Sequence, residues 1–379
     1  MASTGGLKVD ESGEPGEGLL ISSANDRSAI SQGMDNAETS GTTLEVTNVV
    51  AAKHDALAKP VDVYGCEEIG RSTTEDIKRA GKNDHVFTLE ILPESRHRDG
   101  SLFRGTQLWK VEHHVADRNE TRLADPTDCV IRNGKCTRHK PNRVLQFFSL
   151  KLAELTVGVS SVELYGYIAV RDGMDSLLNY VVNISRDDPI IVKQGSLIHM
   201  VGPKRGIDMY SIILLEYDMR VKAGKVENDD HQLIDGASAL SDLQGTWNRA
   251  FRKRIHGDCG AVDLVLARIH DAVVANVEVV ISEVQSSFNL CQCSIGGYKK
   301  QIRFFDGAIG ESRGLKRSVV AVVDGSTVDL KFEVASEPSY SMEHRCSFKA
   351  GTHGLDTRQI KTDFGLISVK VAWSTLLST

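Results

Sequence analysis

Aspartates gather in three turn-like stretches of this sequence, and clustered carboxylates are the side chains that bind Ca²⁺. These residues are Asp172 and Asp175, then Asp187 and Asp188, then Asp229, Asp230 and Asp235. Ca²⁺ takes about six to eight oxygen ligands. Loops that meet at one end of a β-sandwich could therefore form a cation site, for which we name Asp172, Asp175, Asp187 and Asp188. The simpler interpretation is that Asp suits turns, because its side chain bonds to its own backbone.

A second chemical feature is a cationic cluster made of Arg249, Arg252, Lys253, Arg254 and His256. The cluster lies in a stretch that we predict to be a short helix, Ser241–Ile255, because its apolar residues recur at helical spacing. Those residues are Leu243, Trp247, Phe251 and Ile255, although Gly245 weakens the pattern. A solvated helix face is one interpretation of the cations. The alternative is an anion-binding surface at Arg249, Arg252, Lys253 and Arg254.

Cysteine and histidine offer a weaker signal. Cys129, Cys136 and His139 form a C-x6-C-x2-H pattern. Zinc sites usually separate paired ligands by about two to four residues, so the match is poor. Cys291 and Cys293 point to one face of a predicted strand, where we expect two buried apolar thiols. Seven cysteines without a secretion signal indicate reduced thiols rather than a disulfide framework.

Composition bounds the class of protein. The chain has 379 residues, 41% of them hydrophobic and 25% charged, and a net charge of −6, as in soluble globular proteins. It has no apolar run of membrane length, and the first 18 residues lack the basic and apolar regions of a signal peptide. We therefore expect a cytoplasmic or nuclear protein with no transmembrane segment. Common nucleotide-binding, hydrolase and metalloprotease motifs are absent, and Gly202–Gly206 is better explained as a tight loop than as a phosphate cradle.

Alternating apolar residues predict the fold class: a mainly β protein with an antiparallel sandwich or barrel-like domain and one short helix. Val162, Leu164, Ile168 and Val170 would share one strand face. The same alternation recurs in Val273–Val284, in Val328–Val334 and toward Trp373. We expect this β-rich domain to span residues 105–379, with a subdivision near 236–257 or an insertion there between two sheets.

The N-terminal stretch has a different composition. Gly, Ser, Thr and acidic residues dominate the first 60 residues, and the first aromatic residue is Tyr64. Such a segment buries too little apolar surface to offset its ordering entropy. We predict a disordered acidic arm and linker over residues 1–100. Cations outnumber acids from Arg96 to Arg143, which indicates a solvated lead-in or, alternatively, an anion or nucleic-acid contact.

The stretch from Asp125 to Leu376 resembles the family of grass-plant proteins that carry the domain of unknown function 6598. The motifs that carry the resemblance are DPTDC (125–129), LQFFSLKLAEL (145–155), LYGYIAVRDGMD (164–175), NISRDDP (183–189), GPKRGI (202–207), LIDG (233–236), LKRSVVAVVDG (315–325) and VKVAWSTL (369–376). The resemblance implies no catalytic residues. In some cereal relatives this domain accompanies a ribosome-inactivating rRNA N-glycosidase domain.

We therefore expect a non-catalytic binding or regulatory protein, connected by resemblance with plant stress or defence, and with no obligatory cofactor. A protein partner is expected first, with RNA or the ribosome as the alternative. Two other classes stay open: an rRNA N-glycosidase-related translation inhibitor, and a Ca²⁺-dependent sandwich at a membrane surface. An N-glycosidase would need a Glu-x-x-Arg helix, and Glu68–Arg71 is the only such spacing of note, with flanks that do not fit the motif.

Overall fold

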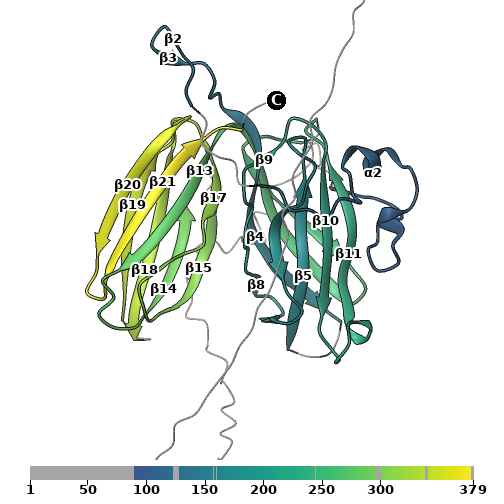
Figure 1. Ribbon diagram of the computed structural model, residues 1–379. Coiled ribbons are helices and arrows are strands. Elements are labelled where there is room, and N and C mark those ends of the chain that lie inside the picture. The colour runs from purple at the N-terminus through teal and green to yellow at the C-terminus, as the bar shows by residue number, and fades with distance from the viewer. Residues whose placement is uncertain are drawn as a thin grey trace, which may run out of the picture. The chain divides into compact units, whose positions relative to one another are not determined.

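One strand, β13 (Gly260–Ser282), is shared by two β-sandwiches (Figure 1). The computed structural model describes residues 89–122, 128–156, 158, 160–243, 245–295, 300–337 and 340–376, all within the compact unit Val63–Thr379. Antiparallel strand pairing dominates these residues, which confirms the predicted mainly β, antiparallel fold class. The residues before Leu89, with most of the predicted arm, lie outside the described part of the chain.

The first sandwich packs a six-stranded sheet against the first half of β13 and its neighbours. The six-stranded sheet contains β1 (Leu89–Ile91), β11 (His231–Leu240), β10 (Ile213–Val221), β5 (Ser161–Arg171), β6 (Asn179–Ile184) and β7 (Ile190–Lys193). The facing layer contains β12 (Arg249–His256), β13, β4 (Asn142–Leu155), β8 (Leu197–Ile198) and β9 (Ile207–Asp208). Leu264 on β13 and Ile168 on β5 are both fully buried in the core between these layers.

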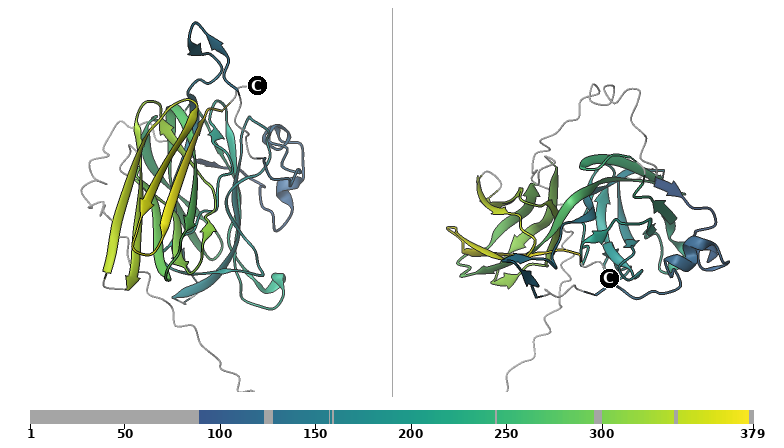
Figure 2. Two further views of the ribbon diagram at one scale, coloured as in Figure 1. Left: turned by 60° about the vertical axis from the view of Figure 1, so that its left-hand side comes forward. Right: turned by 90° about the horizontal axis from the view of Figure 1, so that it is seen from above.

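The second sandwich uses the other half of β13. One layer contains β15 (Gln301–Ile309), β14 (Phe288–Ile295), β18 (Thr327–Glu337) and β19 (Tyr340–Lys349). The other contains β13 with β17 (Ser318–Val323), β16 (Arg313–Gly314), β21 (Leu366–Ser374) and β20 (Gly354–Lys361). Seen from above, the layers of each sandwich are visible end-on (Figure 2). The two cores meet along β13, so residues 236–257 do not divide them. This stretch instead contains the end of β11 in one layer of the first sandwich and β12 in the other.

The predicted alternation explains which residues enter the cores. Val162, Leu164, Ile168 and Val170 all lie in the first core, whereas the alternating apolar residues of Val273–Ile281 lie in the second. The pairing of β13 with β4 is irregular between Ile269 and Ala272, and Asp271 there has a φ of 53°. The chain therefore bends at the point where β13 passes from one core to the other.

The predicted helix over Ser241–Ile255 is wrong, because residues 249–256 form strand β12, paired with β13 from Arg249↔Arg268 to His256↔Ala261. A spacing of four residues is even, so it satisfies one face of a strand as well as one face of a helix. Phe251 and Ile255 accordingly reach the first core. Asn248 adopts a φ of 56°, a left-handed conformation that interrupts any helix before the strand.

The one α-helix among the described residues is α2 (Leu108–Glu112), accompanied by two 3₁₀ turns, η1 (Ser101–Phe103) and η2 (Glu227–Asp229). None of the described helices has the length and apolar character of a membrane span. Residues 89–100 differ from the predicted linker, because β1 in this stretch pairs with β11. Leu102 and Val115 also pack with Leu214 and Ala237 in a small separate cluster.

Because β13 belongs to both cores, we predict that the two sandwiches unfold together. Leu264→Ala should lower the free energy of unfolding by about 2–5 kcal/mol, since it leaves a cavity at a fully buried site. Calorimetry should show one transition, displaced as a whole. The control is Leu243→Ala, at a residue that is 88% exposed, which should change stability by less than about 0.5 kcal/mol. Two transitions, only one of which shifts to lower temperature in Leu264→Ala, would show that the two sandwiches unfold separately.

Candidate functional site

A buried ion pair organises the outer face of the six-stranded sheet. Arg171, the last residue of β5, donates from Nε to Oε1 of Glu216 on β10 at 2.5 Å, and both side chains are fully buried. The same guanidinium donates to the backbone carbonyls of Ser176 and Asp117, at 2.8 and 2.6 Å. A buried charge needs such partners, because its desolvation is costly. Arg171 thus fixes the turn after β5 and the segment after α2 onto the sheet.

His97 extends this network. Its Nδ1 lies 2.8 Å from Oδ1 of Asp235, and its Nε2 lies 2.8 Å from the hydroxyl of Tyr167 and 3.5 Å from Oε2 of Glu216. Burial lowers the pKa of His97, but hydrogen bonds to Asp235 and Glu216 outweigh burial, so the net shift is upward. Arg118 donates to the Tyr167 hydroxyl at 3.0 Å. These contacts connect the segment before α2 with β5, β10 and β11.

The aspartates predicted to bind a cation are separated by the structure. Asp172 and Asp175 lie in the turn between β5 and β6, whereas Asp187 and Asp188 lie beyond the other end of β6, where both are exposed. A strand of six residues spans about 17–20 Å. The four carboxylates therefore do not form one cation site in this structure.

Arg205 pairs with both carboxylates of the first turn, Asp172 and Asp175. Its Nη1 and Nη2 donate to the two oxygens of Asp172 at 2.6 and 2.7 Å, and Nη2 also donates to Asp175 at 2.8 Å. Burial, together with the nearby charge of Asp172, raises the pKa of Asp208 to about 6. The loop Gly202–Gly206 therefore supplies an arginine to a carboxylate cluster, which its sequence alone did not predict.

In the other acidic turns, Asp230 is paired in a similar way. Arg186, next to Asp187, donates from Nε to Asp230 at 2.7 Å, and the Tyr165 hydroxyl donates to the same carboxylate at 2.8 Å. Arg186 thereby joins the loop after β6 to the loop after β10. Asp235 lies elsewhere, in the His97 network described above. Asp230 and Asp235 are thus held by protein donors.

The four predicted anion-binding residues lie together on β12. Arg249, Arg252 and Arg254 are exposed, and Lys253 is half-buried. Arg254 donates from Nε and Nη2 to the two oxygens of Asp263 on β13, at 2.6 and 2.9 Å. The hydrogen bond from Arg254 is the main reason that the pKa of Asp263 lies below its ordinary value. Among the described strands, only β13 pairs with β12, so β12 is an edge strand.

A cation–aromatic stack adjoins the start of β12. The Arg143 guanidinium lies 5.3 Å from the ring centres of both Tyr210 and Trp247. The Arg268 guanidinium lies 4.6 Å from the centre of the Trp247 ring. Tyr210 is 51% exposed. Sequence reasoning missed this stack, because its members are up to 125 residues apart in the chain.

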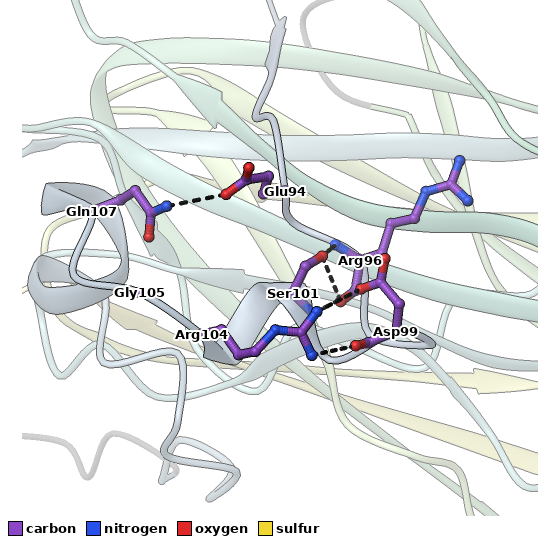
Figure 3. Close-up of a pocket in the computed structure, with 7 residues that line it drawn as sticks. All are labelled: Glu94, Arg96, Asp99, Ser101, Arg104, Gly105 and Gln107. Carbon is purple, nitrogen blue, oxygen red and sulfur yellow. Dashed lines mark hydrogen bonds and ion pairs between the residues drawn. The ribbon is translucent and has the colours of Figure 1, made fainter.

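A surface pocket of about 640 Å³ lies in the segment between β1 and α2 (Figure 3). It is lined by Glu94, Arg96, Asp99, Ser101, Arg104, Gly105 and Gln107. Several of these groups are bonded to one another: Arg104 donates to the Asp99 carbonyl at 2.5 Å, and Gln107 donates to Glu94 at 3.4 Å. The pocket is therefore polar and largely satisfied internally.

The weak cysteine and histidine signal gains support from the geometry. Cys136 Sγ and Cys129 Sγ lie 3.2 and 3.7 Å from Nδ1 of the buried His139. Among the described residues, these three form the one group of ligand atoms close enough together to hold a metal ion. Hydrogen bonds, mainly from the His139 backbone N–H, lower the pKa of Cys136 to about 6. By contrast, Cys291 and Cys293 form a thiol pair with 3.6 Å between the sulfurs.

A family model for the domain of unknown function DUF6598 matches residues 144–371, which is more than half of the chain. The chain belongs to the DUF6598 family. Both sandwiches lie largely within this domain, as do Arg205, β12 and the stack at Arg268. His97 and the Cys129–His139 cluster precede it. No curated protein matches the sequence.

Solved structures resemble the DUF6598 chain only at low scores. The C2A and C2B domains of extended synaptotagmin 2 are 11% identical, with 68% of this chain and 100% of that chain covered and a TM-score of 0.24. Human GIVD cytosolic phospholipase A2 with an inhibitor and terbium is 8% identical, with 63% and 33% covered and a TM-score of 0.21. Similarity at these TM-scores supports no conclusion about the fold or the function of this chain.

We predict that the Arg205 contact is essential for stability. Arg205→Ala leaves Asp172 buried without its guanidinium partner, which should cost about 3–5 kcal/mol in the free energy of unfolding. Urea denaturation measures this loss. The control is Lys204→Ala, which removes only a surface ion pair to Glu120 and should cost less than about 1 kcal/mol. Equal losses for the neighbouring variants would show that burial of the pair is unimportant.

The His97 network predicts a specific pH dependence. A histidine whose pKa is raised on folding adds stability below its unfolded pKa of about 6.5, and this stability is lost as pH rises through the folded pKa. Asp235 and Glu216, whose pKa values are lowered, stay ionised throughout this range. The difference in melting temperature between wild type and His97→Gln should therefore be larger at pH 6 than at pH 9.

The matched control is His231→Gln, at an exposed histidine at the start of β11. Its effect on the melting temperature should be small and should change little between the two pH values. A His97→Gln effect that stays constant from pH 6 to pH 9 would mean that the charge of His97 contributes nothing.

Proposed function

We propose that this protein is a non-catalytic binding protein that takes up an acidic segment of a protein partner along β12. The observation that carries the proposal is that β12 is an edge strand whose exposed side chains are mainly cationic. The unpaired edge of a strand presents backbone N–H and C=O groups that can accept another strand. Cations on such an edge repel basic strands and attract acidic ones, so the edge favours acidic segments.

Charge on β12 is only partly balanced by the protein itself. Arg254 is paired with Asp263, whereas Arg252 has no ion-pair partner among the described residues. Arg252 and Arg254 share the strand face opposite Ile255, two residues apart. Asp263 already balances the charge of Arg254, so a bound carboxylate would pair with Arg252. Binding should therefore weaken as salt rises, because exposed charges are screened.

RNA is a second candidate partner, favoured by the stack of Arg143 with Tyr210 and Trp247. Exposed aromatic and arginine surfaces can stack on bases, and cations nearby can contact phosphates. Depurination of rRNA is not part of the proposed function. Glu68 and Arg71, which have the spacing of an N-glycosidase motif, lie outside the described residues. The proposed roles in plant stress or defence, and the cytoplasmic or nuclear location, are supported only by family resemblance and by the sequence.

Fluorescence anisotropy with a labelled glutamate-rich peptide tests the proposal. The peptide should bind saturably, and Arg252→Glu should weaken binding about tenfold, since it replaces attraction by repulsion. Hydrogen exchange should slow at the β12 amides when the peptide binds, as strand addition requires. The control is Lys349→Glu, a charge reversal at an exposed residue of another edge strand, β19, which should leave binding unchanged.

An RNA oligonucleotide of equal charge is measured in parallel. RNA binding that is lost in Tyr210→Ala, together with an absence of peptide binding, would favour the second candidate. If Arg252→Glu and Lys349→Glu weaken peptide binding equally, the effect depends only on the total charge of the protein. That result would contradict the role of β12.

A further inference from the structure

The Cys129, Cys136 and His139 cluster lies on a hairpin that has no hydrophobic core. Its strands, β2 (Ile131–Arg132) and β3 (Lys135–Cys136), contain two residues each, and Ile131 is 59% exposed. None of the described residues from 128 to 141 takes part in a hydrophobic core cluster. An isolated two-stranded hairpin is at best marginally stable. Something other than apolar burial must hold this hairpin in one conformation.

The turn of the hairpin explains how the unusual ligand spacing works. Asn133 and Gly134 have φ values of 50° and 74°, as a type I′ turn requires, and they set the register Ile131↔Cys136. The backbone N–H of Thr137 donates to the Val130 carbonyl at 2.8 Å, which extends the pairing by one step. Cys129 is therefore brought back across the hairpin to Cys136. Six intervening residues separate the two thiols in sequence but not in space.

Distances within the cluster fit a metal better than a simple hydrogen bond. With Zn–S of about 2.3 Å and Zn–N of about 2.1 Å, a tetrahedral site places sulfur and nitrogen about 3.6 Å apart. The two observed separations from His139 Nδ1 are 3.2 and 3.7 Å. All three ligand atoms lie within 4.8 Å of one another. A single ring nitrogen carries at most one proton, so it cannot donate a full hydrogen bond to both sulfurs.

A second histidine lies beside the cluster. The ring of His353, in the loop between β19 and β20, has its centre 5.4 Å from the centre of the His139 ring. His353 is exposed, so its imidazole can turn without leaving a packed core. The geometry points to a Zn²⁺ site formed by Cys129, Cys136 and His139, with His353 as the fourth ligand. Thiolate and imidazole together suit Zn²⁺, and the fourth ligand would fasten the hairpin to the second sandwich.

Metal analysis of the full chain tests the site. Protein purified under reducing conditions without chelator should contain close to one zinc per chain. After removal of zinc, Co²⁺ should give visible d–d bands and a thiolate-to-cobalt charge-transfer band in the near ultraviolet. The d–d bands and the charge-transfer band should both disappear in the double variant Cys129→Ser, Cys136→Ser and in His139→Ala. His353→Ala should keep thiolate coordination but weaken Zn²⁺ binding about tenfold or more.

Cys291→Ser is the matched control, because Cys291 belongs to the second close thiol pair of the described residues. It should bind Co²⁺ as the wild type does. Zn²⁺ should raise the melting temperature of wild type and of Cys291→Ser but not of the double variant. In the absence of metal all three should melt alike, since the hairpin lies outside the cores.

Three results would each overturn the zinc site. The first is fully reduced protein that gives no cobalt bands and contains no zinc. The second is a quantitative disulfide between Cys129 and Cys136 in protein kept under reducing conditions. The third is cobalt coordination that survives in the double variant but is lost in Cys291→Ser.

Discussion

The architecture depends on the continuity of β13. The strand has 23 residues, and its ladders change partners along its length: β12 and β4 flank residues 260–269, whereas β17 and β21 flank the part beyond Ala272. Each half presents one apolar face to a different core. If β13 separates from one sandwich, its strand pairing in the other sandwich is therefore also disturbed, and backbone groups there become exposed. The left-handed residue Asp271 provides the bend that lets one strand serve two cores.

The second constraint is the cost of burying charge. Arg171, Arg205 and Arg186 each hold carboxylates that would otherwise lose their solvation, and each joins segments that are distant in sequence. Breaking such a pair leaves an uncompensated buried ion, which is why it fixes conformation even where its net contribution to stability is small. The acidic turns thus act as anchors for arginines. A sequence shows the carboxylates but not the guanidinium that reaches them.

Strand positions and the mainly β fold class could be predicted because alternation depends on near neighbours in the sequence. Val162–Val170 illustrates this, with every predicted inward residue found in a core. The Ser241–Ile255 interpretation failed because a four-residue spacing is shared by both periodicities, and pairing with β13 decided between them. The contact between Arg205 and Asp172 depends on tertiary structure. It therefore has no local pattern in the sequence from which it could be predicted. The Asn133–Gly134 dipeptide, by contrast, is a local signal that would have predicted the hairpin at Cys129 and Cys136.

The net charge of the chain is a poor guide to the local charge of its surface. Residues Met1–Glu45 contain eight acids and two cations, so they account for the whole net charge of −6, and the remainder of the chain is formally balanced. Within that balanced remainder, Asp172, Glu216 and Asp230 lie in buried ion pairs, whereas Arg249, Arg252 and Arg254 are exposed on one strand. At physiological ionic strength charges interact over only about 8 Å. The surface at β12 is therefore cationic, although the chain as a whole is acidic.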